Sequence, residues 1–310
     1  MEILLSIRNL TKYKKKRVLS FKKDNNKILD SIYLNIYKNE VISLLGETLS
    51  GKSTLGKAIL KLVPIDKGKI LYDNQDITDF NNKKMKSIRK EMQILFQHSQ
   101  KFINPRISIF EVITEALINS KLSKDEINIR VYDILEIVGL SKNILNKLSI
   151  ELTATELEKI MLAKVLILKP KFLIVDEPTS NLNSKDKYRI VSLLKKVKKS
   201  SNITILLIST DPKVVISMAD RIAIIYKGQI IEILTPKDFI ETPLHPYTKL
   251  LSQDINIEDI DKKNSSYKKD RCQFLDRCSL VKDRCYLEKP KLKEYINDHH
   301  IACFLYEKKI

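Results

Sequence analysis

Short apolar runs recur along the chain and predict buried strands. VISLL at 41–45, FLIV at 172–175 and ITILLIS at 203–209 are apolar almost throughout, without the alternation of a half-exposed strand. Such runs favour parallel strands that are covered on both faces of a sheet. STLGKAILKLV, which follows the first run, has helical spacing, and IAIIYKGQIIEI at 222–233 is typical of a hairpin that turns at Lys227 and Gly228.

A long helical stretch separates the first two of these strands. IFEVITEALINSKL and INIRVYDILEIVGL carry apolar residues at helical spacing. We therefore expect an α/β domain over residues 1–250, with an inserted helical subdomain at about 98–168. The apolar periodicity fades after about 250 and the cysteines begin, which predicts a small cysteine-containing C-terminal extension at 251–310.

The chain is strongly basic, but its lysines are dispersed. The net charge is +18, and 43% of the residues are hydrophobic, unlike the composition of a disordered chain. Such a charge would suit nucleic acid or an anionic membrane surface. Because the lysines are spread over the whole sequence, we favour a general compositional bias over a dedicated polyanion site, and we expect no nucleic-acid partner.

The sequence gives no sign of a membrane span or a secretion signal. No apolar run approaches the roughly 18 residues that a spanning helix needs. The N-terminus, MEILLSIRNLTKYKKK, lacks a basic region before its short apolar stretch. We therefore expect a cytoplasmic protein.

The segment GETLSGKS, between a predicted strand and a predicted helix, fits the phosphate-loop pattern G-x-x-x-x-G-K-S/T. Backbone N–H groups of such a loop and of the next helix point at phosphate oxygens. Lys52 would reach the β and γ phosphates, and Ser53 would bind Mg²⁺. The other candidate nucleotide-binding residues are Gly46, Glu47, Thr48, Leu49, Ser50, Gly51 and Thr54. A chance match is disfavoured because two of only six glycines fall on the required positions.

A pair of carboxylates follows the second predicted strand. In FLIVDE, the strand would deliver Asp176 to the metal and Glu177 to the attacking water. The alternative is a strand end followed by a solvated acidic turn. The phosphate loop upstream favours the catalytic interpretation.

With these motifs in order, the chain resembles the ATP-binding subunits of ABC transporters. GETLSGKS matches Walker A, Gln97 in ILFQ the Q-loop, FLIVDE Walker B, and SNLN at Ser180 to Asn183 the D-loop. INPRISI at 103–109, TPLHPYTKLL at 242–251 and the cysteine-bearing tail resemble the oligopeptide and dipeptide importer branch in particular.

The resemblance covers essentially the whole chain and implies a P-loop ABC ATPase fold that binds ATP and Mg²⁺. It implies that Gln97 contacts the metal and senses the γ phosphate. It also implies a peripheral position on the cytoplasmic face of the membrane, with a second ATPase subunit and two permease subunits as partners. An extracellular or periplasmic solute-binding protein would take part indirectly.

The segment LTATE, Leu152 to Glu156, stands where this family carries its Leu-Ser-Gly-Gly-Gln signature. In the family, the signature presents a serine hydroxyl and glycine N–H groups to the other subunit's nucleotide. Here Thr153 and Glu156 have capping-box spacing, repeated by Thr155 and Glu158. Both glycines are absent and Glu156 adds a negative charge, so we expect a helix that is capped by its own side chains.

Other positions also depart from the family pattern. Thr210 replaces the switch histidine, Asn183 replaces the D-loop aspartate, and Leu49 replaces a usual glycine. Tyr13 is a candidate for stacking on adenine, although Lys14 occupies the position of the family's aromatic residue. Loss of one group that stabilises transition-state charge typically slows a reaction on the order of 100-fold to 1000-fold, so hydrolysis at this chain's own site is expected to be weak.

All four cysteines lie in the tail, at Cys272, Cys278, Cys285 and Cys303. A cytosolic chain disfavours structural disulfides, so the cluster indicates a metal. In the importer family, similar tails hold a four-iron iron–sulfur cluster, and zinc held by four thiolates is the chemical alternative. Four reduced thiols in a small core remain the plain alternative.

Together, these features predict the ATP-binding half of a peptide importer, degenerate and paired with a more intact subunit. Two alternatives come from other classes: a regulatory or structural pseudo-ATPase, and a soluble nucleic-acid-associated ABC protein. The second alternative usually carries two cassettes in one chain, whereas this chain has one.

Overall fold

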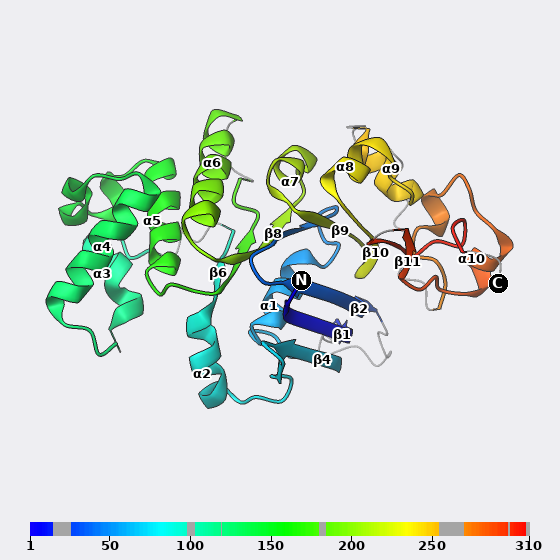
Figure 1. Cartoon of the computed structure of the whole chain (residues 1–310), viewed down its shortest axis with the longest axis horizontal. Helices are drawn as coiled ribbons and strands as arrows, with labels where there is room; N and C mark the ends of the chain where they lie inside the picture. Colours follow the sequence, from blue (N-terminus) through cyan, green and yellow to red (C-terminus); the bar gives the residue numbers. More distant parts are fainter. Residues whose placement is uncertain are drawn as a thin grey trace, which may run out of the picture. The chain divides into compact units, whose positions relative to one another are not determined.

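The chain is described here by a computed structural model, shown in Figure 1. The structure describes residues 1–14, 26–97, 103–118, 120–179, 184–253, 270–296 and 298–307, with only the backbone at 184 and 185. It divides into two compact units, one formed by Met1–Phe80 with Leu207–Ile310 and the other by Asn81–Leu206.

The first unit begins with an antiparallel sheet that the apolar pattern did not predict. Its strands pair in the order β2-β1-β4-β5. Their bounds are β1 Ile3–Tyr13, β2 Lys27–Tyr37, β4 Lys67–Tyr72 and β5 Gln75–Asp76. Buried Leu5, Ile7 and Leu10 alternate only partly with polar residues along β1, so the period-2 signal is weak.

The first unit also contains the strand that leads into the phosphate loop. Strand β3 (Val41–Leu45) is buried throughout and pairs in parallel with β9 (Arg221–Tyr226), as the continuous apolar runs predicted. Strands β9 and β10 (Gln229–Leu234) form the predicted hairpin. Lys227 and Gly228, at the turn, have φ values of 43° and 78°, as tight hairpin turns require.

Helices of this unit begin at clear capping residues. Proline occupies the first turn of α7 (Pro212–Met218), α8 (Pro236–Glu241) and α9 (Pro246–Ser252), behind caps at Asp211, Thr235 and His245. Helix α1 (Lys52–Ile59) follows the phosphate loop. The tail adds a 3-10 turn at Leu275–Arg277, helix α10 (Asp283–Leu287), and strands β11 (Lys293–Ile296) and β12 (His299–Ile301).

The described part of the tail joins the core of the first unit. Phe274 packs into an apolar cluster with residues of β3, β9, β10, α8 and α9, among them Tyr226 and Tyr247. Cys272 and Cys278 pack against the same cluster, and β12 pairs with β10. The tail is therefore fixed directly onto the strands that follow the phosphate loop.

The second unit contains the helical region. Strands β6 (Met92–Leu95) and β7 (Phe172–Asp176) pair in parallel, and the helices predicted from periodicity stand between them in the chain. The helices are α2 (Asn82–Glu91), α3 (Ile109–Thr114), α4 (Lys124–Val138), α5 (Ala154–Leu166) and α6 (Ser184–Ser200), with 3-10 turns at Glu115–Leu117, Lys142–Asn146 and Ser149–Glu151. Strand β8 (Thr204–Ser209) lies where the chain passes from one unit to the other.

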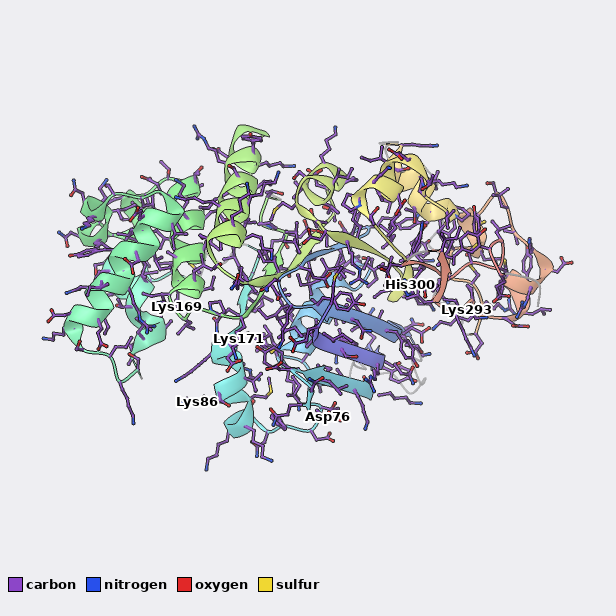
Figure 2. All side chains as sticks on the ribbon, in the orientation of Figure 1. Asp76, Lys86, Lys169, Lys171, Lys293 and His300 are labelled. Carbon is purple, nitrogen blue, oxygen red and sulfur yellow. The ribbon has the colours of Figure 1, made fainter. Side chains whose placement is uncertain are left out.

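The lysine side chains project from many elements. Lys86 lies on α2, Lys169 and Lys171 lie before β7, and Lys293 lies on β11, as the labels of Figure 2 show. This distribution in the structure follows their dispersal along the sequence.

Candidate nucleotide-binding site

The phosphate loop joins β3 to α1 and depends on two glycines. A Cβ atom at Gly46 would lie 2.2 Å from the carbonyl oxygen of Ile225, so only glycine fits beside β9. Gly51 has a φ of 106°, and a Cβ there would lie 2.8 Å from the carbonyl oxygen of Ile28. These two close approaches explain why the motif requires glycine at both ends of the loop.

Lys52 lies inside the loop, as its proposed role requires. Its side chain is 5% exposed, and its Nζ donates hydrogen bonds to the carbonyl oxygens of Gly46 at 2.7 Å and Glu47 at 2.8 Å. The N–H of Gly228, in the neighbouring hairpin turn, donates to the carbonyl oxygen of Ser50. The loop therefore holds a positive charge at the N-terminus of a helix, an arrangement suited to binding phosphate.

The tip of the loop carries Leu49, the residue that replaces a usual glycine of the motif. Leu49 is 98% exposed and adopts a φ of 67°, in the left-handed region that favours glycine. Thr48 beside it is also exposed, while Ser53 and Thr54 are half-buried in the first turn of α1. The leucine side chain thus stands free at the loop tip and contributes no packing.

Glu47 has two partners that the sequence did not reveal. Its backbone N–H donates to the hydroxyl of Tyr247 at 3.1 Å, and its Oε1 accepts a hydrogen bond from Nη1 of Arg277 at 2.8 Å. Tyr247 belongs to the HPYT segment, which suggested the importer branch without suggesting a contact. No pattern in the sequence pointed to Arg277.

The acidic pair lies in the second unit, at the end of β7. Asp176 is buried, and Glu177 is half-buried with a φ of 50°, an uncommon conformation for a non-glycine residue. Gln97 is exposed and follows β6. The D-loop residues, Ser180 to Asn183, lie outside the described residues.

Two further expected positions lie in the first unit. Tyr13 is half-buried at the end of β1, where its backbone N–H donates to Oδ2 of Asp66 at 2.8 Å. Thr210 is exposed and directly follows β8. Asp211 next to it caps α7, with its carboxylate accepting the N–H of Lys213.

The segment in the signature position is self-capped, as predicted. Helix α5 begins after Thr153, whose hydroxyl accepts the N–H of Glu156 while Glu156 accepts the N–H of Thr153 at 2.9 Å. These hydrogen bonds from Thr153 lower the pKa of the Glu156 carboxyl, which favours its negative form. The second predicted capping box does not start a helix, because Thr155 already lies inside α5.

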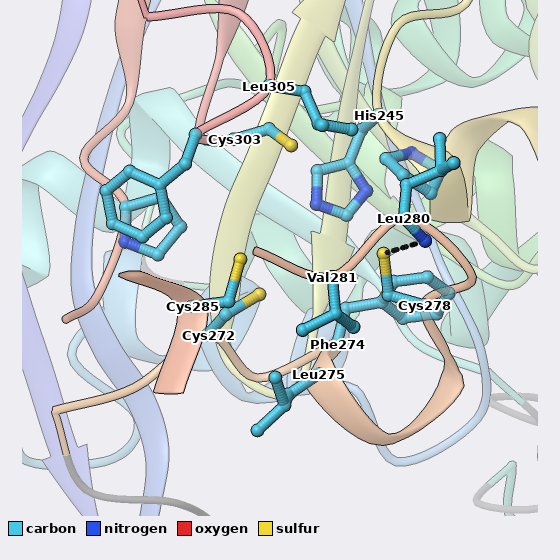
Figure 3. Close-up of a pocket in the computed structure, with 13 residues that line it drawn as sticks. His245, Cys272, Phe274, Leu275, Cys278, Leu280, Val281, Cys285, Cys303 and Leu305 are labelled. Carbon is cyan, nitrogen blue, oxygen red and sulfur yellow. Dashed lines mark hydrogen bonds between the residues drawn. The ribbon is translucent and has the colours of Figure 1, made fainter. Parts of the chain in front are cut away.

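The four cysteines border one small cavity in the tail, together with His245, Phe274 and other apolar side chains (Figure 3). No cysteine forms a disulfide. The N–H of Leu280 donates to Sγ of Cys278. Burial raises the pKa of the Cys272 and Cys303 thiols to about 11, so both are neutral at pH 7.

The structure does not support the metal centre that was expected from these cysteines. Four thiols are suitable donors for iron–sulfur or zinc, and the fold brings all four to one cavity. The cavity, however, measures about 10 Å³, which is room for roughly one water molecule. No three cysteine, histidine or acidic side chains in the described ranges are arranged to hold a metal ion.

Comparison with known proteins places this chain in a family. Residues 29–180 match the family described as ABC transporter, and residues 231–285 match the oligopeptide/dipeptide transporter C-terminal region. The oligopeptide transport ATP-binding protein AppD of Bacillus subtilis is 34% identical over 99% of this chain and 98% of its own length. A putative peptide import ATP-binding protein of Brucella ovis is 32% identical over 97% of both chains. The chain belongs to the ATP-binding proteins of ABC transporters.

Solved structures agree with this ABC ATPase fold. CbiO1 of Clostridium perfringens, part of an ABC transporter complex, covers 78% of the chain and 92% of its own length with a TM-score of 0.70 and 28% identity. A dimeric ATP-binding cassette bound to ADP and phosphate has a TM-score of 0.65 at 24% identity, covering 75% of this chain and 99% of its own, and shows the fold alone.

The predicted fold class, an α/β P-loop ABC ATPase with a helical insertion, is thereby confirmed. Within the described residues of this ABC ATPase, no helix combines the length and apolar character needed to cross a bilayer.

Proposed function

We propose that the phosphate loop of this ABC ATPase binds the phosphates of ATP with Mg²⁺. The observation that carries the proposal is the buried ammonium of Lys52, held inside a glycine-bounded loop at the N-terminus of α1. The loop N–H groups and Lys52 would bind the phosphates, together with Thr54 in the first turn of α1, and Ser53 would bind the metal.

The remaining catalytic roles follow the family motifs. Asp176 and Gln97 would hold the Mg²⁺ ion, and Glu177 would orient the attacking water. Tyr13 is the candidate for contact with adenine. Asp176 is buried at the end of β7, the position that Walker B gives to the metal-binding aspartate.

The chain serves, in this proposal, as the ATP-binding subunit of a peptide importer on the cytoplasmic face of the membrane. The match to the oligopeptide/dipeptide C-terminal region and the names of the relatives support this substrate class. Its partners are a second ATPase subunit, two permease subunits and, indirectly, an external solute-binding protein. We also propose that the chain has a domain boundary near residue 250 and a helical subdomain at about 98–168.

Two motifs make this subunit the weaker half of a heterodimer. Thr210 cannot supply an imidazole, and the capped start of α5 occupies N–H groups that a phosphate would need. The same cap favours a second candidate function, a regulatory subunit that binds ATP without turnover. ATP hydrolysis by the heterodimer carrying Glu177→Gln separates the two, because a regulatory subunit would leave the rate unchanged.

Nucleotide affinity of Lys52→Ala tests the phosphate site. We expect ATP to bind at least about tenfold more weakly, because charge-assisted hydrogen bonds of 1.5–3 kcal/mol are roughly the size of one to two tenfold steps. Lys57→Ala is the matched control, since Lys57 lies on the same helix but in its last turn. Equal affinity of the two variants would remove the assignment.

A further inference from the structure

Glu47 puts a negative charge into a loop that is built to receive a polyanion. Its carboxylate is 31% exposed, in the second position of the phosphate loop. A free carboxylate there would repel a triphosphate, and the repulsion would be stronger than in bulk water because the loop is partly buried. The structure must therefore offset this charge if the loop is to bind ATP well.

Arg277, from the cysteine-bearing tail, supplies the offsetting charge. Its Nη1 lies 2.8 Å from Oε1 of Glu47, and its side chain is only 12% exposed. The two residues are 230 positions apart in the sequence. The tail thus reaches the phosphate loop with one buried guanidinium.

Three aromatic rings surround this guanidinium. Its central carbon lies 5.8, 6.0 and 5.7 Å from the ring centroids of Tyr226, Tyr247 and Phe274. The rings also pack on one another, with centroid separations of 4.7 to 5.5 Å. Arginine suits such a place because its planar group stacks on rings and remains charged when buried.

Tyr247 gives the loop a second tie to the same cluster. Its hydroxyl accepts the backbone N–H of Glu47, and its ring is fully buried. Burial also raises the pKa of this hydroxyl, so Tyr247 stays neutral. Glu47 is therefore held at its backbone by Tyr247 and at its carboxylate by Arg277, and both partners contact Phe274 of the tail.

We propose that Arg277 is a positioning residue for nucleotide binding, which neutralises Glu47 and fixes the start of the phosphate loop. This inference rests on the proposed ATP site. It makes the described part of the tail a component of the nucleotide site, in addition to any role of its cysteines.

A charge-removal cycle tests the proposal in the full chain, with ATP affinity measured directly. Arg277→Gln leaves Glu47 unpaired, so we expect ATP to bind about tenfold more weakly. Glu47→Gln alone removes the negative charge from the loop and keeps Arg277, so we expect ATP to bind about threefold more tightly than in the wild type. The double variant, Arg277→Gln with Glu47→Gln, should recover affinity to within about threefold, because no unpaired charge remains.

The control is Arg284→Gln. Arg284 is also a tail arginine over an aromatic ring, 4.5 Å from the centroid of Phe304, and it pairs with Glu288 and Glu307 instead of with the loop. We expect its removal to leave ATP affinity unchanged. Equal losses in Arg284→Gln and Arg277→Gln would indicate a general effect on the tail and overturn the proposal.

Two further results would overturn it. A double variant as weak as Arg277→Gln alone would show that Arg277 acts through packing and not through the Glu47 charge. If Arg277→Gln does not fold, Arg277→Lys keeps the charge but not the stacked planar group, so we expect it to lose less than about tenfold in ATP affinity. A loss of tenfold or more there contradicts charge neutralisation. A wild-type chain that binds no ATP would instead refute the proposed function itself.

Discussion

At the scale of single residues, Leu49 is the position where the phosphate loop departs most visibly from its pattern. Its backbone has a φ of 67°, and its side chain is almost fully exposed at the loop tip. A left-handed conformation costs a non-glycine residue about 1–2 kcal/mol. The side chain regains nothing by burial, so this loop carries uncompensated strain.

Replacing Leu49 by glycine should therefore stabilise the protein. Relief of the strain exceeds the roughly 0.5–1 kcal/mol of chain entropy that glycine costs, so we expect the thermal midpoint to rise by about 1–3 °C. Thermal unfolding of Leu49→Gly measures this. Thr48→Gly is the control, because Thr48 is not among the described residues with positive φ, and there glycine should lower the midpoint. Equal midpoints for the two variants would contradict the strain argument.

The sequence identified the residues of the phosphate loop but not their partners. Gly46, Lys52 and Ser53 could be named because a contiguous motif carries its own geometry. Arg277 could not be, since its role depends on a contact made 230 residues away. Arg277 is one of three tail arginines that each precede a cysteine, and nothing in that repetition marks the one that contacts the loop.

At the scale of elements, the success of prediction followed the strength of the local signal. Strand β3, the β9–β10 hairpin and the capped start of α5 were predictable because each is encoded by continuous apolar runs, turn residues or caps. Strands β1 and β6 were not, because β1 alternates imperfectly and β6 has only four residues. The sequence has capping-box spacing at both Thr153 and Thr155. A helix has only one N-cap residue, and in α5 this residue is Thr153.

Glu232 on β10 joins three elements of the first unit. Its carboxylate accepts the backbone N–H groups of Leu244 and His245, ahead of α9, and lies 2.7 Å from Nε2 of His299 on β12. It is fully buried. Burial alone would raise the pKa of this carboxyl, but the hydrogen bonds from His299 and the two backbone groups hold the pKa below its usual 4.5.

Glu232 should therefore stabilise the first unit in a pH-dependent way. Because its pKa is lowered on folding, its contribution is complete above about pH 4.5 and is lost as the pH falls through the lower folded value. Glu232→Gln should reduce the free energy of unfolding at pH 7 on the order of 2 to 3 kcal/mol, since hydrogen bonds to a charged group are lost. Denaturant unfolding at pH 7 and at pH 4 measures both values, and the difference between variant and wild type should shrink at pH 4.

The matched control for this prediction is Glu241→Gln on α8. Glu241 is exposed, and its Oε2 lies 3.9 Å from Nζ of Lys237, one helical turn away. Exposed pairs of this kind contribute little, so we expect almost no change at either pH. A deficit in Glu232→Gln that is the same at pH 7 and pH 4 would show that shape, and not charge, explains its effect.

At the scale of the whole molecule, the nucleotide motifs are divided between the two compact units. The phosphate loop belongs to the first, and Gln97, Asp176, Glu177 and the segment at 152–156 belong to the second. Family resemblance assigned all of them from sequence, because their order along the chain is diagnostic. The level of activity does not follow from that order, since in the proposed heterodimer it also depends on the motifs of the partner subunit.

The degenerate motifs should act on two different nucleotides. In a head-to-tail ABC dimer, each ATP lies between one subunit's Walker motifs and the other subunit's signature. In the proposed heterodimer, Thr210 would therefore weaken the site that uses Lys52 and Glu177, whereas the segment at 152–156 would weaken the partner's site. We expect the rate of ATP hydrolysis to be reduced less at the first site, because Glu177 remains and the partner can supply an intact signature.

Restoring the signature should therefore raise turnover at the partner's site. The variant combines Thr153→Ser, Ala154→Gly, Thr155→Gly and Glu156→Gln, which removes the carboxylate cap and reopens the start of α5 to phosphate. We expect the heterodimer to hydrolyse ATP at least about tenfold faster, since one charge-stabilising contact is typically worth on the order of 100-fold to 1000-fold in rate. The stability of the variant should fall, because two glycines in the first turn of a helix cost on the order of 1 kcal/mol each.

Mutation of the partner's own catalytic glutamate must abolish the gain in rate, since the gain belongs to that site. A restored heterodimer no faster than the wild type would show that the self-capped helix does not limit turnover, and the asymmetry would then have to originate at Thr210.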